Sequence, residues 1–87
     1  MDKREFILIV DEDDSQRQEI KEYLSDAYRV GEYANGKEAF DYMSQNPLEV
    51  NLVIAGARLG DSSGFQLLHL LKDSKSLNAI PVIMLAD

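Results

Sequence analysis

The chain has 87 residues, of which 45% are hydrophobic and 29% charged, and it contains no cysteine. This length fits one small domain over residues 1–87, and the lack of cysteine excludes disulfides, thiolate metal sites and cysteine nucleophiles. Nine basic against sixteen acidic residues give a formal net charge of -7, which disfavours binding to nucleic acid or to an anionic membrane. No apolar run is long enough for a membrane span or a signal peptide, so we expect a cytoplasmic protein.

Strand and helix patterns alternate from the start of the chain. The apolar run at residues 6–10 is typical of a strand buried on both faces of a parallel sheet. It stops at an acidic stretch, residues 11–14, after which apolar residues recur at helical spacing from residue 20 to residue 28. Ser15 and Gln18 have the spacing of a capping box and predict where this helix begins.

The alternation continues to the last residues. A shorter, more polar segment at residues 30–34 predicts an edge strand, and the helix after it ends at Asn46-Pro47. Residues 50–55 predict a third strand, and a helix from Phe65 has an apolar face broad enough for burial on more than one side. Pro81 opens a last strand over residues 82–85. We expect the four tyrosines at the boundary of the core: Tyr23, Tyr28, Tyr33 and Tyr42.

This order of elements predicts the fold class α/β with an open parallel sheet. In such sheets, binding sites form where the strands end at their carboxyl edge. In this chain, the residues that follow the strands at that edge are 11–13, 56–61 and 86–87. We therefore expect any functional site among them.

The chain resembles the receiver domain of two-component response regulators. The first strand with Asp11, Glu12 and Asp13, the segment 34–39, Leu59 with Gly64-Phe65, and the segment 80–85 all match that family in order and spacing, without a gap. The resemblance covers essentially the whole chain. It implies a flavodoxin-like, three-layer sheet in the order 2-1-3-4, with the family's last helix, strand and helix absent.

The resemblance also implies a phosphoryl-transfer site, in which a histidine kinase phosphorylates an aspartate after the third strand. Asp11 and Glu12 match the pair that holds Mg²⁺ in the family. The phosphorylated aspartate falls on Gly56 and the switch threonine or serine falls on Ala86. The chain stops before the position of the family's lysine. Neither Gly56 nor Ala86 carries the oxygen that the chemistry needs, so the resemblance implies a degenerate receiver.

The position of Gly56 can be checked by counting. In the family the acceptor precedes the glycine that opens the third helix by eight positions, and eight positions before Gly64 is Gly56. With the third carboxylate missing, no cofactor is required, and weak Mg²⁺ or Ca²⁺ binding is the most that we expect at Asp11 and Glu12. Arg58 is a candidate to replace the cation; the alternative is a surface arginine in a loop.

Other polar residues near the site have ordinary interpretations. Asp61 could be a substitute acceptor, but a turn aspartate is the simpler reading, and His69 is better explained by packing or surface exposure than by phosphorylation. Ser62 and Ser63 are positioned to cap the third helix.

The sequence therefore predicts a receiver domain that is not an enzyme and acts by contact with protein partners, a kinase or an effector. Two alternatives stay open: a regulator phosphorylated at another residue, and a small acidic domain that binds Mg²⁺ or Ca²⁺. Because the chain stops after its fourth strand, we interpret it as the N-terminal part of a longer fold. An uncovered apolar edge strand predicts a homodimer or larger oligomer when these residues fold alone.

Overall fold

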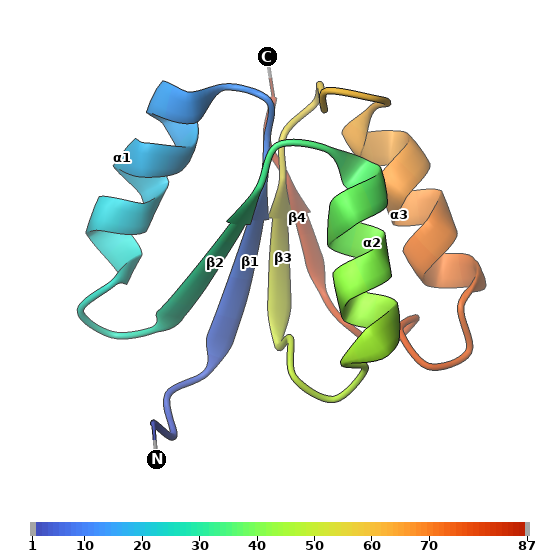
Figure 1. Ribbon diagram of the computed structural model, residues 1–87, viewed down its shortest axis with the longest axis horizontal. Coiled ribbons are helices and arrows are strands. Elements are labelled where there is room, and N and C mark those ends of the chain that lie inside the picture. Colours follow the sequence, from blue (N-terminus) through green and yellow to red (C-terminus); the bar gives the residue numbers. More distant parts are fainter. Residues whose placement is uncertain (1, 87) are drawn as a thin grey trace.

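The computed structural model describes residues 2–86. Among these residues seven elements alternate between strand and helix (Figure 1): β1 Phe6–Val10, α1 Asp14–Leu24, β2 Arg29–Tyr33, α2 Gly36–Gln45, β3 Leu52–Ala55, α3 Gly64–Asp73 and β4 Val82–Met84. The strands pair in parallel in the order β2-β1-β3-β4. The predicted open parallel α/β sheet is therefore confirmed, including the position of the second strand at an edge.

Two unequal helical layers cover the sheet. Figure 1 shows α1 on one side of the strands and α2 with α3 on the other. On the side of α2 and α3, Leu8 and Val53 of the sheet pack in one buried cluster with residues of both helices: Ala39, Met43, Leu67 and Leu71. On the opposite side, Ile9 and Ile54 are neighbours in register and buried, but α1 contributes no buried residue.

The start of α1 differs from the prediction. Asp13 is the N-cap, and its carboxylate accepts a hydrogen bond of 3.1 Å from the backbone N–H of Gln16. The predicted capping box of Ser15 and Gln18 is wrong, because the acidic stretch supplies the cap first and Ser15 already lies within the helix. The helix ends at Leu24, before the apolar spacing in the sequence runs out.

The predicted end of α2 and the predicted serine cap of α3 are both confirmed. The side chain of Asn35 caps α2 by accepting the N–H of Glu38 at 2.9 Å, and the helix stops before Asn46. At the start of α3, Ser63 and Gln66 form a reciprocal capping box. These caps hold α2 and α3 in place at the carboxyl edge of the sheet.

Fewer apolar residues are buried than their pattern in the sequence predicts. In α3, Leu67 and Leu71 are buried, but Phe65 is 65% exposed and Leu70 is 48% exposed, so the helix packs on one side only. Tyr23 is also exposed, at 86%, rather than at the boundary of the core. Among residues 2–86, no helix has the length and apolar character that a membrane span needs.

Candidate functional site

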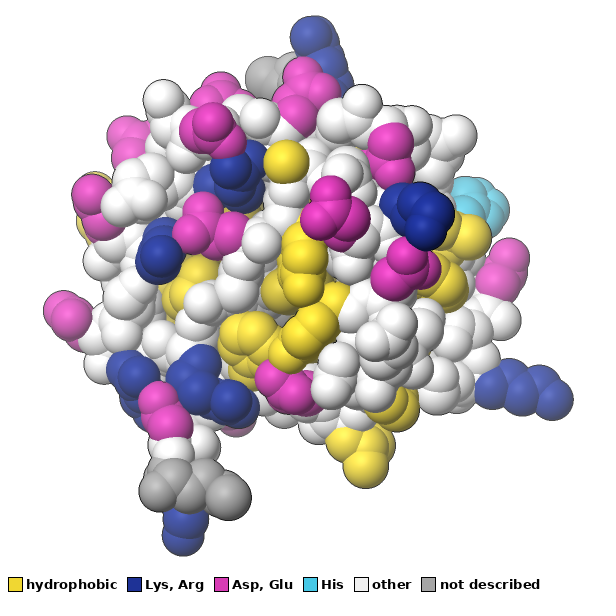
Figure 2. Space-filling view, viewed as in Figure 1, with side chains coloured by type: hydrophobic (Ala, Val, Ile, Leu, Met, Phe, Trp, Pro, Cys, Tyr) yellow, Lys and Arg dark blue, Asp and Glu magenta, His cyan; other side chains and the backbone are white. Residues whose placement is uncertain are grey.

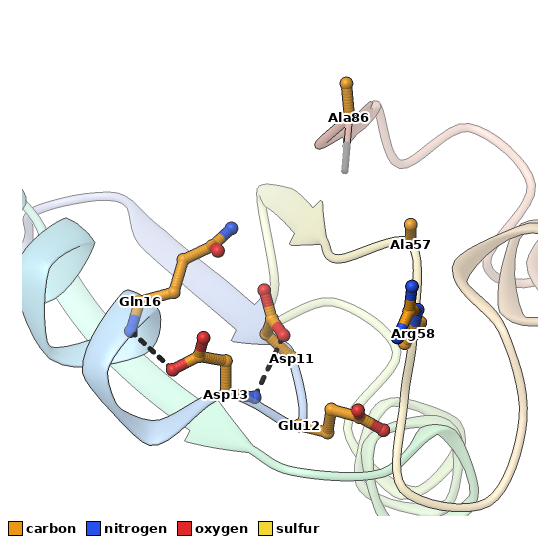
Figure 3. Close-up of a pocket in the computed structure, with 7 residues that line it drawn as sticks. All are labelled: Asp11, Glu12, Asp13, Gln16, Ala57, Arg58 and Ala86. Carbon is orange, nitrogen blue, oxygen red and sulfur yellow. Dashed lines mark hydrogen bonds between the residues drawn. The ribbon is translucent and has the colours of Figure 1, made fainter.

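The carboxyl edge of the sheet carries a polar pocket of about 290 Å³. Asp11, Glu12, Asp13 and Gln16 line it from the end of β1 and the start of α1; Ala57 and Arg58 line it from the loop after β3; and Ala86 follows β4. Figure 3 shows Asp11 with Gln16 and Asp13 on one side and the loop that carries Arg58 on the other. The structure therefore brings together residues from all three segments that the sequence places at this edge, although not every residue of the segment 56–61 lines the pocket. Asp87 lies outside the described residues.

Asp11 is the buried member of this pocket. It is 5% exposed, and its carboxylate accepts the backbone N–H of Asp13 at 3.0 Å. Its own N–H donates to the carbonyl of Tyr33 at 3.1 Å. Hydrogen bonds at both its backbone and its side chain thus fix the turn between β1 and α1.

Arg17 holds this turn from the helix. Its guanidinium donates to the backbone carbonyl of Asp11 and to the carboxylate of Asp14, and it pairs with Glu32 at 3.4 Å. Lys21, one turn further along α1, also pairs with Glu32 at 3.2 Å. These basic side chains join α1 to β2 and leave the carboxylate of Asp11 facing the pocket. That Arg17 joins α1 to the turn after β1 and to β2 is visible only in the structure.

Gly56 lies directly against the carboxylate of Asp11. The N–H of Gly56 donates to the carbonyl of Val10 at 2.7 Å, which extends the pairing of β1 and β3 by one residue. A Cβ atom added to Gly56 would lie 2.5 Å from Cγ of Asp11, far inside normal contact. The carboxylate of Asp11 therefore occupies the space in which a side chain at position 56 would begin.

These residues do not fit a tight magnesium site. Mg²⁺ needs near-octahedral oxygen coordination, and the resemblance predicts the glycine at position 56 where the family has its third carboxylate. One carboxylate oxygen of Asp11 is engaged by the N–H of Asp13. Within residues 2–86, no group of three or more His, Cys, Asp or Glu side chains is arranged to hold a metal ion. Weak binding at Asp11 and Glu12 stays a prediction.

Arg58 lines the same pocket and supports it through its backbone. Its carbonyl accepts the N–H of Glu12 at 3.3 Å, and the residue pairs with Ser63 in a single antiparallel bridge. Among the described residues, no ion pair within 4.0 Å joins Arg58 to Asp11 or Glu12. That Arg58 replaces the cation stays a prediction.

Ala86 lies at the outer side of the pocket. It follows β4 and is exposed. Its methyl group can neither donate nor accept a hydrogen bond. If Ala86 stands where the family has a hydroxyl, as the resemblance predicts, its side chain offers no hydrogen bond to a phosphoryl group.

Asp61 lies outside this pocket and has a structural role. Its carboxylate accepts the backbone N–H groups of Gly36 at 2.8 Å and Lys37 at 3.0 Å, and the hydroxyl of Ser62 at 3.0 Å. The hydrogen bond from Gly36 is the largest cause that lowers the pKa of Asp61 below its usual 3.8. Asp61 thus joins the loop after β3 to the start of α2. This role could not be predicted from the sequence, because Asp61 lies 25 residues after Gly36.

Comparison with known proteins agrees with this geometry. The response regulator receiver domain family matches residues 7–87. The two-component response regulator-like protein APRR5 of Arabidopsis thaliana is 35% identical over 92% of this chain and 14% of its own length. A solved structure, a putative response regulator from Chloroflexus aurantiacus, has a TM-score of 0.87 at 28% identity, over 94% of this chain and 66% of that one.

The chemotaxis regulator CheY4 of Vibrio cholerae shares the fold, with a TM-score of 0.84 at 23% identity over 93% of this chain and 67% of that one. The chain spans only 11% to 14% of the length of the first curated relatives that it matches. The strand order, the acidic loop after β1 and the family match point to the same conclusion. The chain belongs to the response regulator receiver domains of two-component signalling, which interact with protein partners such as kinases and effectors.

Proposed function

We propose that this receiver domain is not phosphorylated at the family's usual position and signals through protein contact alone. The observation that carries the proposal is the glycine at position 56, directly after β3. Phosphoryl transfer to a protein needs a side-chain nucleophile, and glycine has none. The kinase's usual target atom is therefore missing from the chain.

The surroundings of Gly56 support the same proposal. The carboxylate of Asp11 fills the space next to its Cα, in which the side chain of an acceptor residue would begin. Glu12 and Asp13 line the rest of the pocket. A phosphate placed there would face three carboxylates without the full ligand set of a metal ion to offset the repulsion.

The contacts of the alternative acceptors disfavour the regulator phosphorylated at another residue. Both carboxylate oxygens of Asp61 accept backbone N–H groups at the start of α2, so phosphorylation there would break the link between the loop and the helix. His69 is exposed on α3 and does not line the acidic pocket. The proposal further includes a cytoplasmic location, no catalysis by the domain itself and no required cofactor, as the sequence predicts.

Treatment with acetyl phosphate and Mg²⁺ followed by intact mass measurement tests this proposal. A receiver domain that retains the acceptor aspartate, treated in the same way, serves as the positive control. We expect the control to gain one phosphoryl group and this chain to gain none. A stoichiometric phosphoryl adduct on this chain would overturn the proposal, and repeating the treatment with Asp61→Asn and His69→Ala would then identify the acceptor.

A further inference from the structure

A second hollow, separate from the acidic pocket, lies between α2 and α3. It measures about 470 Å³, and we call it the α2–α3 groove. Phe40 of α2 and Leu67 and Leu70 of α3 provide its apolar lining. Leu67 is part of the buried core and Phe40 packs against that core, whereas Leu70 is 48% exposed. The groove therefore combines a fixed floor with apolar surface that water still reaches.

The rim of the groove is acidic. Lys37 is its one lysine, paired with Asp41 at 2.8 Å, and Asp61 lines the groove beside it. Glu38 also lies close enough to contribute with these acids to the raised pKa of Lys37, whose largest cause is the hydrogen bond to Asp41. Asp73 lines the side formed by α3. Two carboxylates, those of Asp61 and Asp73, thus line the groove itself, and those of Glu38 and Asp41 lie near its one ammonium group.

The face with the groove is visible in Figure 2. The chain's one histidine, shown in cyan, lies beside hydrophobic atoms, with basic and acidic side chains next to them. The histidine is His69, which lines the groove from α3. Because Ser63 caps α3 and Asp61 binds the start of α2, both walls are held before any partner arrives.

We propose that the α2–α3 groove binds a short amphipathic helix of a partner protein that presents an apolar side chain between lysine or arginine residues. Charge complementarity selects this occupant: the apolar side chain covers Leu70 and Phe40, and the basic residues face the acidic rim. A helix fits better than an added strand, because the groove lies between two helices and offers no sheet edge. The inference rests on the proposed function only in that the domain acts by protein contact.

Titration of the isotope-labelled chain with a synthetic helical peptide of leucine, alanine and lysine tests the proposal. The readout is the set of backbone amide shifts. We expect saturable shifts at residues of the groove, such as Phe40, Gln66 and Leu70. The same peptide with glutamate in place of lysine is expected not to bind. Shifts scattered over α1 and the rest of the acidic surface, or equal binding of the glutamate peptide, would overturn the proposal.

Two leucine variants provide the matched comparison. Leu70→Ser removes the exposed apolar side chain of the groove, whereas Leu48→Ser removes one that is 95% exposed and outside it. We expect Leu70→Ser to weaken peptide binding about fivefold and Leu48→Ser to leave it unchanged. Equal affinities of the two variants for the peptide would refute the proposal that the peptide binds in the α2–α3 groove. Since Gly56 lies outside the groove, a phosphoryl adduct in the mass experiment would leave this result intact, and failure here would leave the absence of phosphorylation intact.

Discussion

The two faces of the sheet are covered by different amounts of helix. On the side of α2 and α3, both helices contribute buried side chains, among them Met43, Leu67 and Leu71. On the side of α1, the helix contributes none, and the row formed by Ile9, Ile54 and Ile83 changes from fully buried in β1 to 50% exposed in β4.

This difference shows which side of the sheet contributes most to the stability of the domain and which side leaves apolar surface exposed to solvent. The side of α2 and α3 forms a continuous core, so substitutions there must leave a cavity. The side of α1 keeps apolar surface at β4 without a helix over it among the described residues. The comparison therefore predicts unequal costs for equal truncations on the two sides.

The largest expected effect comes from the core beneath α3. Leu71→Ala removes a fully buried side chain and should lower the free energy of unfolding by about 3 kcal/mol. Ile83→Ala removes a side chain of the same size from the other face, where half of it is exposed, and should cost less than about 1.5 kcal/mol. Urea denaturation of both variants measures the difference, and equal losses would break the comparison of the two faces.

The carboxyl edge, where the two faces meet, is expected to be sensitive to one added methyl group. Gly56→Ala places Cβ against the carboxylate of Asp11, which must then move and lose the hydrogen bond that it accepts from the N–H of Asp13. We expect the free energy of unfolding to fall by about 1–2 kcal/mol. Gly60→Ala is the matched control, because its Cβ would meet its nearest neighbours at an ordinary 3.6 Å. Unfolding in urea compares the two.

A double-mutant cycle identifies the cause of that loss. In an Asp11→Ala background the carboxylate is gone, so adding Gly56→Ala should cost much less than it does in the parent chain. Two outcomes would contradict this cause: Gly56→Ala is as stable as Gly60→Ala, or Gly56→Ala lowers the free energy of unfolding equally with and without the Asp11 carboxylate. Either would mean that the close approach of Asp11 to Gly56 does not affect stability.

Most of the fold could be predicted from the alternation of patterns, because a buried parallel strand and an amphipathic helix differ in hydrophobic period. The finer errors have physical causes. Asp13 rather than Ser15 caps α1 because several neighbouring residues are able to cap, and only the backbone geometry selects one. The exposure of Phe65 and Leu70 was not predictable, because a count of apolar residues does not tell how many elements cover a helix.

The sequence could name residues that meet at one pocket, but not their contacts. The acidic loop after β1 pointed to Asp11, and counting back from Gly64 gave Gly56 as the acceptor position, which stays a prediction. The packing of Asp11 on Gly56 depends on a side-chain conformation that no sequence pattern encodes. The hydrogen bonds of Asp61 depend in the same way on the meeting of two loops far apart in the chain.

On the side of α2 and α3, we expect a smaller effect on stability that depends on pH and on the carboxylate of Asp61. The N–H groups of Gly36 and Lys37 lower the pKa of Asp61 below 3.8, so its contribution to stability is present above that pH and is lost as the pH falls through the lower, folded-state pKa. Asp61→Asn should therefore flatten the fall in stability in acid. The control is Glu19→Gln, on the exposed surface of α1. Thermal unfolding from neutral pH to below 3.8 measures this, and identical curves for Asp61→Asn and the parent would show that the hydrogen bonds of the Asp61 carboxylate to the start of α2 do not contribute to stability.

The smallest expected effect on stability belongs to the open face, where association is the informative measurement. Ile83→Lys adds a charge to a half-exposed position of β4 and should change the free energy of unfolding by less than about 1 kcal/mol. The sequence predicts that these residues self-associate when folded alone, and a lysine on an edge strand opposes pairing between sheets. Light scattering should then show a smaller mass for Ile83→Lys than for the parent chain and for Leu48→Lys, which carries the same added charge away from the sheet. A monomeric parent chain, or equal masses for the two lysine variants, would mean that the exposed isoleucine of β4 is not a contact between copies.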